Sequence, residues 1–441
     1  MMCRLKRLFS ATGLILLAAP ALAVAPASPN RNSAAPPDDA ALARAIDAYT
    51  RPLVERGDLS GQLLVLRRGR VVVERSFGFA NFELRAPVTP ETRFDIASVT
   101  KPMTGVLAIQ QAVAGRLNTR DSITRWFPDF PRGDSITVSM LLRHRSGIPH
   151  EIVPDSAMTR PFSAAEIVER AERLPLDFAP GTRESYSSGG YEVLARILER
   201  VSGKSYATLA ADSIFTPLEM THTSHVDSRQ IVPGRATGYV PGIYGIENAP
   251  LQDFSGLVGA GSVWSTARDL HRFVAAIVAG RLGEGPRLSY VRGGRVDFNG
   301  RTGGFKAWAW WDSTSGIEEI LVSNLASGAP DVLKGAIPRL ANGEKLVPPS
   351  PPALRAEAAP LEELKRWEGV YQIEHGPRLD VRVHDGALYC NDWLLLPAAD
   401  GTFYSPRDYG LVRGVPGANG HLARLDWTQG GVIYPAPRVG D

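Results

Sequence analysis

The stretch Phe94-Asp95-Ile96-Ala97-Ser98-Val99-Thr100-Lys101-Pro102 opens an apolar segment that continues to Ala114. Small and apolar residues lie on every side of a helix drawn over 97–114, which is typical of a helix buried inside a fold. Proline is tolerated only near the start of a helix, so Pro102 places that start at about Ser98. The sequence therefore predicts a buried helix that begins at Ser98.

Strands are predicted on both sides of this helix along the chain. Residues 62–66 and 71–77 favour a hairpin, with its turn at 67–70. Residues 304–311 and 317–323 carry apolar side chains on both alternating faces, and such strands need helices on both sides of their sheet. We therefore expect one sheet that combines strands from the two ends of the same unit.

Amphipathic patterns predict helices around these strands. The first follows Asp38, a candidate cap, with apolar residues at helical spacing up to Leu53. Further helices are predicted at 164–174, 191–201, 266–279 and 332–340. The first unit is thus expected to be an α/β fold, helix–sheet–helix in section, with an all-helical lobe.

A second unit follows a proline-rich stretch. Residues 342–360 predict a linker, and residues 361–441 contain short strand candidates separated by turns. That spacing predicts a small β-barrel or a sandwich. The candidates lie at 369–373, 379–383, 387–390, 394–396, 403–405, 411–413, 422–427 and 432–434.

Residues 1–23 predict a signal peptide. Basic residues precede an apolar run over 11–19, and Ala21-Leu22-Ala23 is a small-x-small cleavage site. A membrane anchor is the alternative, but the run is short for a bilayer and Pro20 interrupts it. Residues 24–37 then predict a loose tether, and 38–341 the first folded unit. We expect an exported protein, periplasmic or secreted, with no membrane span after signal removal.

Composition narrows the expected partners. The formal net charge is +3, and three basic residues in the signal region supply the whole excess. A neutral mature chain gives no electrostatic reason to expect nucleic acid as a partner. Cys390 is the one cysteine beyond the signal, so no intramolecular disulfide is expected. His222 and His225 lack partners at ligand spacing, so no metal site is predicted.

The motif Ser98-Val99-Thr100-Lys101 places a hydroxyl and an amine one turn apart on the same helix face. Burial disfavours an ammonium ion, so a buried lysine amine is a plausible base for a serine. The N–H of Ser98, at the helix start, lacks an intrahelical partner and can face a developing oxyanion. A capping serine beside a solvated lysine is the alternative, although the apolar flanks favour a buried Lys101.

A second motif, Tyr186-Ser187-Ser188-Gly189-Gly190-Tyr191, precedes a predicted helix. A tyrosine beside the serine can relay a proton to a leaving group. The hydroxyl of Ser188 can hydrogen-bond Lys101 or a substrate. A glycine-rich turn with core tyrosines is the alternative interpretation.

A third motif, Arg301-Thr302-Gly303-Gly304, opens an apolar strand. Arginine and a threonine hydroxyl together can bind a carboxylate. Glycines such as Gly303 let a substrate approach the strand backbone, and the N–H of Gly304 is a candidate second oxyanion donor. The alternative is a plain turn into a strand, with Arg301 in solvent.

In this order and spacing, the three motifs resemble the serine β-lactamase and penicillin-binding protein superfamily. The likeness is greatest to its class C β-lactamase-like branch, which includes esterases, D-aminopeptidases and DD-peptidases. Residues 141–149 and 259–270 share the likeness, which covers about 42–340. The β-rich tail resembles the lipocalin-like domain that often follows such units.

The resemblance implies an antiparallel sheet flanked by helices and a role for each motif. Ser98 resembles the nucleophile, Lys101 its proton partner and Tyr186 the second acid/base. The N–H groups of Ser98 and Gly304 would form the oxyanion hole. The superfamily needs neither a metal nor an organic cofactor.

Three features depart from the family pattern. Ser188 stands where the family usually has Asn, and a hydroxyl lacks the paired donor and acceptor of an amide. Arg301 stands where Lys or His usually precedes Thr-Gly, and a planar guanidinium is not a simple replacement for either. Residues 280–300 are short for this branch, so we expect one edge strand to be missing.

The predicted function is an exported serine hydrolase that cleaves an ester or amide in a small molecule or short peptide through an acyl-enzyme on Ser98. It would be of the esterase or D-amino-acid peptidase type. A true β-lactamase or a penicillin-binding DD-carboxypeptidase is the alternative. A degenerate binding protein that keeps the pocket is a third hypothesis, and the departures at Ser188 and Arg301 favour it. The sequence leaves the oligomeric state open.

Overall fold

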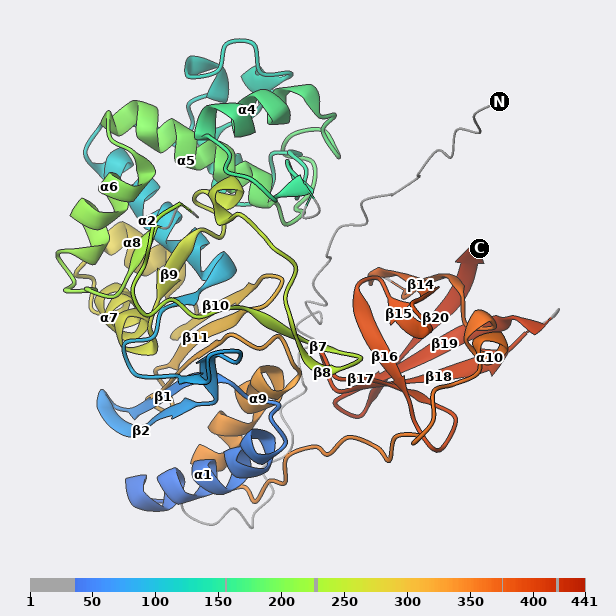
Figure 1. Ribbon diagram of the computed structural model, residues 1–441. Helices are drawn as coiled ribbons and strands as arrows, with labels where there is room; N and C mark the ends of the chain where they lie inside the picture. Colours follow the sequence, from blue (N-terminus) through green and yellow to red (C-terminus); the bar gives the residue numbers. More distant parts are fainter. Residues whose placement is uncertain (1–35, 155–156, 226–228, 375, 418–419, 441) are drawn as a thin grey trace, which may run out of the picture. The chain divides into compact units, whose positions relative to one another are not determined.

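The computed structural model describes residues 36–154, 157–225, 229–374, 376–417 and 420–440 (Figure 1). The predicted signal peptide and nearly all of the tether fall in 1–35, outside the described residues. The described chain divides into two compact units, one up to residue 350 and one from residue 351. Across the described ranges, no helix is both long and apolar enough to cross a membrane.

An antiparallel sheet organises the first unit. Within the described residues its strand order is β10-β11-β12-β1-β2. β1 pairs with β12, so strands from the two ends of the unit meet inside the sheet, as predicted. The strands are β1 (Gly61–Arg67), β2 (Arg70–Phe77), β10 (Arg295–Arg301), β11 (Lys306–Asp312) and β12 (Ile317–Ser323).

The edge strand that we expected to be missing is present. β10 pairs with β11 from Arg295, opposite Asp312, to Arg301, opposite Lys306. Only Val296 and Phe298 are buried along β10, and two alternating apolar residues among glycines give a weak strand signal. That prediction was therefore wrong, and the strand that it omitted is the one that lies against the Ser98 turn.

Helices cover both faces of the sheet (Figure 1). α1 (Asp39–Glu55) and α9 (Ala329–Ala341) pack together on one face, and α7 (Ala267–Val278) and α8 (Glu284–Tyr290) lie on the other. The central buried helix begins with a 3-10 turn, η1 (Ala97–Val99), and continues as α2 (Thr100–Val113).

The helical lobe is built around α5 (Ser188–Ser202), which also packs against the central helix α2. Its neighbours within the lobe are α3 (Val138–Leu142), α4 (Ala164–Arg173) and α6 (Tyr206–Ala210). The α/β unit with an all-helical lobe is thus confirmed. Apolar side chains from the lobe and from one face of the sheet form one continuous core. The remaining strands of this unit are short: β3 (Phe79–Asn81), β4 (Ala86–Pro87), β5 (Phe94–Asp95), β6 (Ser224–His225), β7 (Tyr239–Gly242), β8 (Gly245–Asn248) and β9 (Val263–Ser265).

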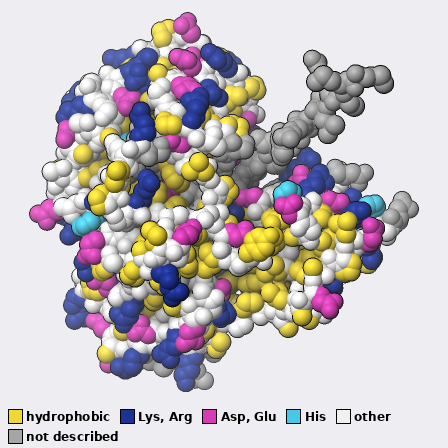
Figure 2. All heavy atoms as spheres, viewed as in Figure 1, with side chains coloured by type: hydrophobic (Ala, Val, Ile, Leu, Met, Phe, Trp, Pro, Cys, Tyr) yellow, Lys and Arg dark blue, Asp and Glu magenta, His cyan; other side chains and the backbone are white. Residues whose placement is uncertain are grey.

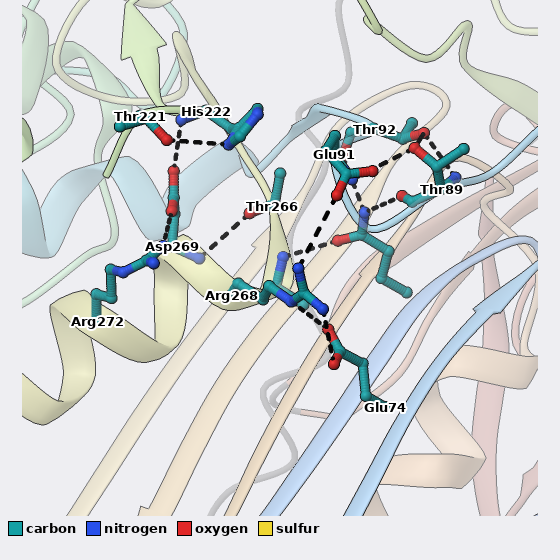
Figure 3. Close-up of polar contacts among 12 residues, drawn as sticks. Glu74, Thr89, Glu91, Thr92, Thr221, His222, Thr266, Arg268, Asp269 and Arg272 are labelled. Carbon is teal, nitrogen blue, oxygen red and sulfur yellow. Dashed lines mark hydrogen bonds and ion pairs between the residues drawn. The ribbon is translucent and has the colours of Figure 1, made fainter. Parts of the chain in front are cut away.

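Polar contacts fix the start of α7, and with it the segment that precedes the helix (Figure 3). The Thr266 side chain caps α7 by accepting the N–H of Asp269 at 3.2 Å. The buried Asp269 carboxylate accepts the N–H of His222 at 2.8 Å. Arg268 binds Glu74 on β2 with an Nε–Oε1 distance of 2.5 Å. These contacts hold the start of α7 next to β2, and they therefore also fix the end of the segment that precedes Thr266.

The second unit is a closed antiparallel barrel in the part of the chain that the structure describes. The sequence left a barrel and a sandwich open, and the barrel is the observed form. Its interior is apolar and includes Trp367, Tyr371, Phe403 and the buried Cys390. A short helix, α10 (Leu361–Lys365), precedes the strands. These are β13 (Gly369–Gln372), β14 (Arg378–His384), β15 (Ala387–Cys390), β16 (Trp393–Pro397), β17 (Phe403–Ser405), β18 (Gly410–Pro416), β19 (Leu422–Gln429) and β20 (Val432–Gly440).

Charges of both signs are mixed on the face of the molecule drawn in Figure 2. On this face, Lys and Arg side chains alternate with Asp and Glu.

Gly61 offers a direct test of the packing between β1 and β12. A Cβ at this position would overlap the carbonyl oxygen of Val322 on β12. We predict that Gly61→Ala lowers the free energy of unfolding by about 1–3 kcal/mol, measured by urea denaturation. Gly335→Ala is the control, since Gly335 lies on an exposed part of α9 with no atom within 4 Å of the new methyl group. The control is expected to stabilise by up to about 1 kcal/mol, and equal losses in both variants would contradict the prediction.

Candidate active site

Ser98 lies in the η1 turn between β5 and α2. β5 pairs with β9, which places Phe94 opposite Ser265 and fixes the approach to the turn. Ala97 has a φ of +48°, a left-handed conformation that costs energy for a residue with a side chain. The Asp95 carboxylate holds this turn, because its Oδ1 accepts the N–H of Ala97 at 2.8 Å. The nucleophile candidate therefore sits on a strained but well-anchored turn.

Asp95 also ties the turn to the β10–β11 hairpin. Its Oδ2 accepts the hydroxyl of Thr302 at 2.8 Å. Burial raises the pKa of Asp95 to about 7, against the opposing effect of these two hydrogen bonds. Sequence analysis quoted Asp95 only as part of the stretch around Ser98 and gave it no role.

Lys101 is buried, with 4% of its surface exposed. Its Nζ lies 3.0 Å from Ser98 Oγ, 3.1 Å from Ser188 Oγ and 2.9 Å from the Ala260 carbonyl oxygen. These three acceptors match the three N–H groups of an ammonium ion. The same geometry also fits a neutral amine that donates to Ser188 and Ala260 and accepts the proton of Ser98.

Tyr186 completes the cluster. Its hydroxyl donates to Ser98 Oγ at 2.7 Å, and Lys101 Nζ lies 4.8 Å from the centroid of its ring. Residues that lie far apart in the sequence thus meet at one oxygen atom. Lys101 and Tyr186 meet at Ser98 Oγ, and Ser188 joins the cluster through Lys101 Nζ, so all four of these residues named from the sequence lie together.

Two histidines that the sequence analysis did not select hold the Tyr186 loop. His144 Nδ1 accepts the N–H of Ser187 at 3.2 Å, and His150 Nδ1 accepts the N–H of Ser188 at 3.2 Å. Their rings lie 4.7 Å and 5.4 Å from the ring of Tyr186. Burial and then the charge of Lys101 lower the pKa of each histidine to about 4. Both rings are therefore neutral acceptors near pH 7. The run 141–149 was an available signal for His144, and His150 lies just after it.

Glu192 is a further buried group beside the cluster. It lies one turn after Ser188 on α5, is 2% exposed, and its Oε2 has no hydrogen-bond partner among the described residues. Burial raises its pKa to about 8, while the charge of Lys101 acts in the opposite direction. The sequence offered no signal for it beyond an acid within an apolar helix.

β10 brings its backbone against the serine turn at Gly300. A Cβ on Gly300 would overlap the Ile96 carbonyl oxygen and lie 3.0 Å from the Ser98 nitrogen. The N–H of Thr302 donates to the Phe305 carbonyl at 3.0 Å. Bonded and non-bonded pairs alternate in an antiparallel ladder, so the N–H of Arg301 points away from β11, toward the open edge of β10. The Arg301 N–H thus lies one residue after Gly300, which is the residue of β10 that lies against the Ser98 turn.

The third sequence motif is dispersed in the structure. The Arg301 guanidinium lies 3.2 Å from the Asp331 carboxylate on α9, on the sheet face opposite to the one that Gly300 presents to Ser98. Gly304, in the turn between β10 and β11, packs against the backbone of Gly238. The nearest neighbour of a Cβ on Gly303, in the same turn, would be the Gln252 side chain. Of this motif, Thr302 alone is recorded in contact with the serine turn, through Asp95. Alternation of side chains along a strand explains this result, because neighbouring residues face opposite sides.

Comparison with known proteins identifies the family. The family model described as "Beta-lactamase" matches residues 46–342, two thirds of the chain. The chain therefore belongs to the β-lactamase family, within the serine β-lactamase and penicillin-binding protein superfamily, and is a serine hydrolase of that superfamily. The resemblance predicted from the motifs is confirmed.

Individual relatives agree with this assignment. PbpX of Bacillus subtilis strain 168, named as a penicillin-binding protein, is 30% identical over 223 residues, which cover 51% of this chain and 56% of PbpX. The chain thus spans about half the length of this relative. Among solved structures, the D-amino acid amidase of Ochrobactrum anthropi SV3 matches with a TM-score of 0.62 and 24% identity, over 69% of this chain and 99% of the amidase. SurE matches with a TM-score of 0.60 and 24% identity, over 90% of this chain and 99% of SurE.

Gly300 tests the contact between β10 and the serine turn. We predict that Gly300→Ala lowers kcat/KM for an activated ester by about a hundredfold, because the new methyl group pushes β10 from the Ser98 nitrogen. Gly303→Ala adds the same group three residues later, where its nearest neighbour is the Gln252 amide oxygen at 3.7 Å. That control is expected to change kcat/KM less than threefold, and similar losses in both variants would refute the assigned contact.

The histidine pair predicts how stability depends on pH. Because the folded state lowers both histidine pKa values to about 4, the unfolded chain takes up protons first as the pH falls below about 6.5. The histidine pair therefore lowers the melting temperature between about pH 6.5 and pH 4, whereas the raised pKa values of Asp95 and Glu192 act in the opposite direction, so the histidine contribution is measured by comparison with a variant. His150→Asn keeps an acceptor but removes the titration, so its melting temperature should fall less steeply over this window. Parallel curves for the variant and the natural protein would show that His150 contributes nothing to the slope.

Proposed function

We propose that the protein is exported and cleaves an ester or amide bond in a small molecule or short peptide, through a covalent acyl-enzyme on Ser98. One observation carries the proposal: Lys101 Nζ and the Tyr186 hydroxyl converge on Ser98 Oγ at 3.0 Å and 2.7 Å. Membership of the β-lactamase family supports the hydrolase chemistry, and the first 23 residues support export. The name of the amidase neighbour is consistent with an amide substrate.

The proposed reaction begins with attack of Ser98 Oγ on the substrate carbonyl carbon. The serine proton passes to Lys101, and charge develops on the carbonyl oxygen. We assign the oxyanion donors as the N–H groups of Ser98 and Arg301, with Arg301 in place of the Gly304 that the sequence suggested. Tyr186 then gives a proton to the leaving alcohol or amine as its bond to the carbonyl carbon breaks.

Deacylation reverses these roles. Water attacks the acyl-enzyme carbonyl carbon and gives up a proton to the Tyr186–Lys101 pair, and the bond to Ser98 Oγ breaks as the serine regains its proton. The products are a carboxylic acid and the alcohol or amine released earlier, so the protein returns to its starting state. No step requires a metal or an organic cofactor.

Variants of the cluster test these roles. We predict that Ser98→Ala abolishes hydrolysis of a short-chain activated ester, and that Lys101→Ala and Tyr186→Phe each lower kcat at least about a hundredfold. Tyr191→Phe is the control, because this tyrosine lies in the same motif but its hydroxyl donates to the Leu142 carbonyl at 3.1 Å. The control should lose less than tenfold. Normal turnover by Lys101→Ala would remove the role assigned to the amine.

A fluorescent penicillin separates the proposal from its alternatives. Mass analysis of the Ser98 peptide after incubation reports any adduct. Ester turnover without a lasting penicillin adduct supports the proposed hydrolase. A stable adduct supports a penicillin-binding carboxypeptidase, and rapid loss of the β-lactam supports a β-lactamase. A folded protein that reacts with neither probe is the result expected of a binding protein.

A further inference from the structure

The face of β10 that meets the serine turn carries no basic side chain. Gly300 touches the Ser98 turn, and Phe298, two residues earlier, shares that face. The ring of Phe298 packs 6.2 Å from the ring of Phe273 on α7 and 5.7 Å from that of Tyr290 on α8. Phe298 is 7% exposed, so this face of the strand is apolar where it approaches the site.

The basic and polar side chains of the same strand lie on the opposite face, against α9. Lys334 on α9 donates to the Asn299 side chain at 2.8 Å, and Arg301 pairs with Asp331 at 3.2 Å. Lys306, opposite Arg301 on β11, also binds Asp331. Arg301 could reach the serine face only by a one-residue shift of β10, which would break its pairing with β11 and expose Phe298.

Among the described residues, Lys101 is the cation in contact with Ser98, and the other buried acidic or basic side chains near it include two carboxyl groups. Asp95 holds the turn itself, and Glu192 is buried one turn beyond Ser188. The Lys101 amine already has Ser98, Ser188 and the Ala260 carbonyl as hydrogen-bond partners. A carboxylate beside the scissile bond would therefore lose its hydration next to an apolar strand and buried acids. Such a loss is costly unless a further cation, beyond the already hydrogen-bonded Lys101, compensates for it.

We propose that the Ser98 site acts on acyl donors whose leaving group is neutral, with no carboxylate next to the scissile bond. Esters and amides of uncharged alcohols and amines fit this site, whereas peptides that end in a free carboxylate at this position do not. The inference rests on the proposed function and names its substrate class.

A matched pair of substrates tests the inference on the mature protein. N-acetyl-D-alanyl glycolate and its carboxamide, the N-acetyl-D-alanyl ester of glycolamide, differ only in a carboxylate on the leaving group. We expect kcat/KM to be at least tenfold higher for the carboxamide, mainly through a lower KM. Equal values or a preference for the carboxylate would overturn the inference while leaving the hydrolase intact. Turnover of neither substrate, or of any activated ester, would instead overturn the proposed function and this inference with it.

Variants of Phe298 link the preference to the strand face. Phe298→Lys places a cation on the serine side of β10 and should reduce the ratio of the two kcat/KM values at least threefold. Phe298→Met, a neutral residue of similar size, should leave the ratio unchanged. Because Phe298 is buried, the melting temperature of each variant is measured first. If Phe298→Lys does not fold, the comparison of the two substrates on the natural protein still decides the question.

Discussion

The buried amine of Lys101 is the contact on which the rest of the site depends. Its nitrogen joins its own helical turn at Ser98 to Ser188 on α5 and to the Ala260 carbonyl before β9. An amine with 4% exposure is tolerated only where hydrogen bonds replace its lost water. The arrangement of α2, α5 and the β9 segment is thus tied to the chemistry, since moving any one of them leaves a polar group unpaired.

The elements around this nitrogen explain how Ser98 is held. β5 and β9 fix the entry to the turn, the Asp95 carboxyl holds its strained backbone, and the neutral His144 and His150 hold the loop that presents Tyr186. The three side chains among these contacts, Asp95, His144 and His150, have pKa values shifted by burial. The geometry of the site is therefore expected to depend on pH through these three supporting side chains as well as through the cluster at Ser98.

Much of the fold could be predicted from the sequence because apolar periodicity is local information. The hairpin over 61–77, α7, β12 and the strands of the barrel lie close to where the patterns placed them. The missed strand β10 has only two apolar residues, and its stability comes from pairing with β11 and from contact with the serine turn. Such tertiary contacts leave no periodic trace in the sequence.

The sequence motifs predicted which residue types take part in the candidate site, but not which way each side chain faces. Ser98, Lys101, Tyr186 and Ser188 meet in the structure, whereas Arg301 faces α9, because the side a strand residue faces depends on register and not on residue type. The supporting contacts of Asp95, His144 and His150, and the buried Glu192 beside them, depend on the fold, because only the folded chain brings these residues together.

A crystal structure of the mature protein after reaction with a phosphonate ester tests the central claim most directly. Such a reagent leaves a tetrahedral group on an activated serine. The account predicts a covalent bond to Ser98 Oγ, Lys101 Nζ within hydrogen-bond distance of that oxygen, and a phosphonate oxygen facing the N–H groups of Ser98 and Arg301. An adduct on another residue, or a Lys101 side chain directed into solvent, would contradict the account.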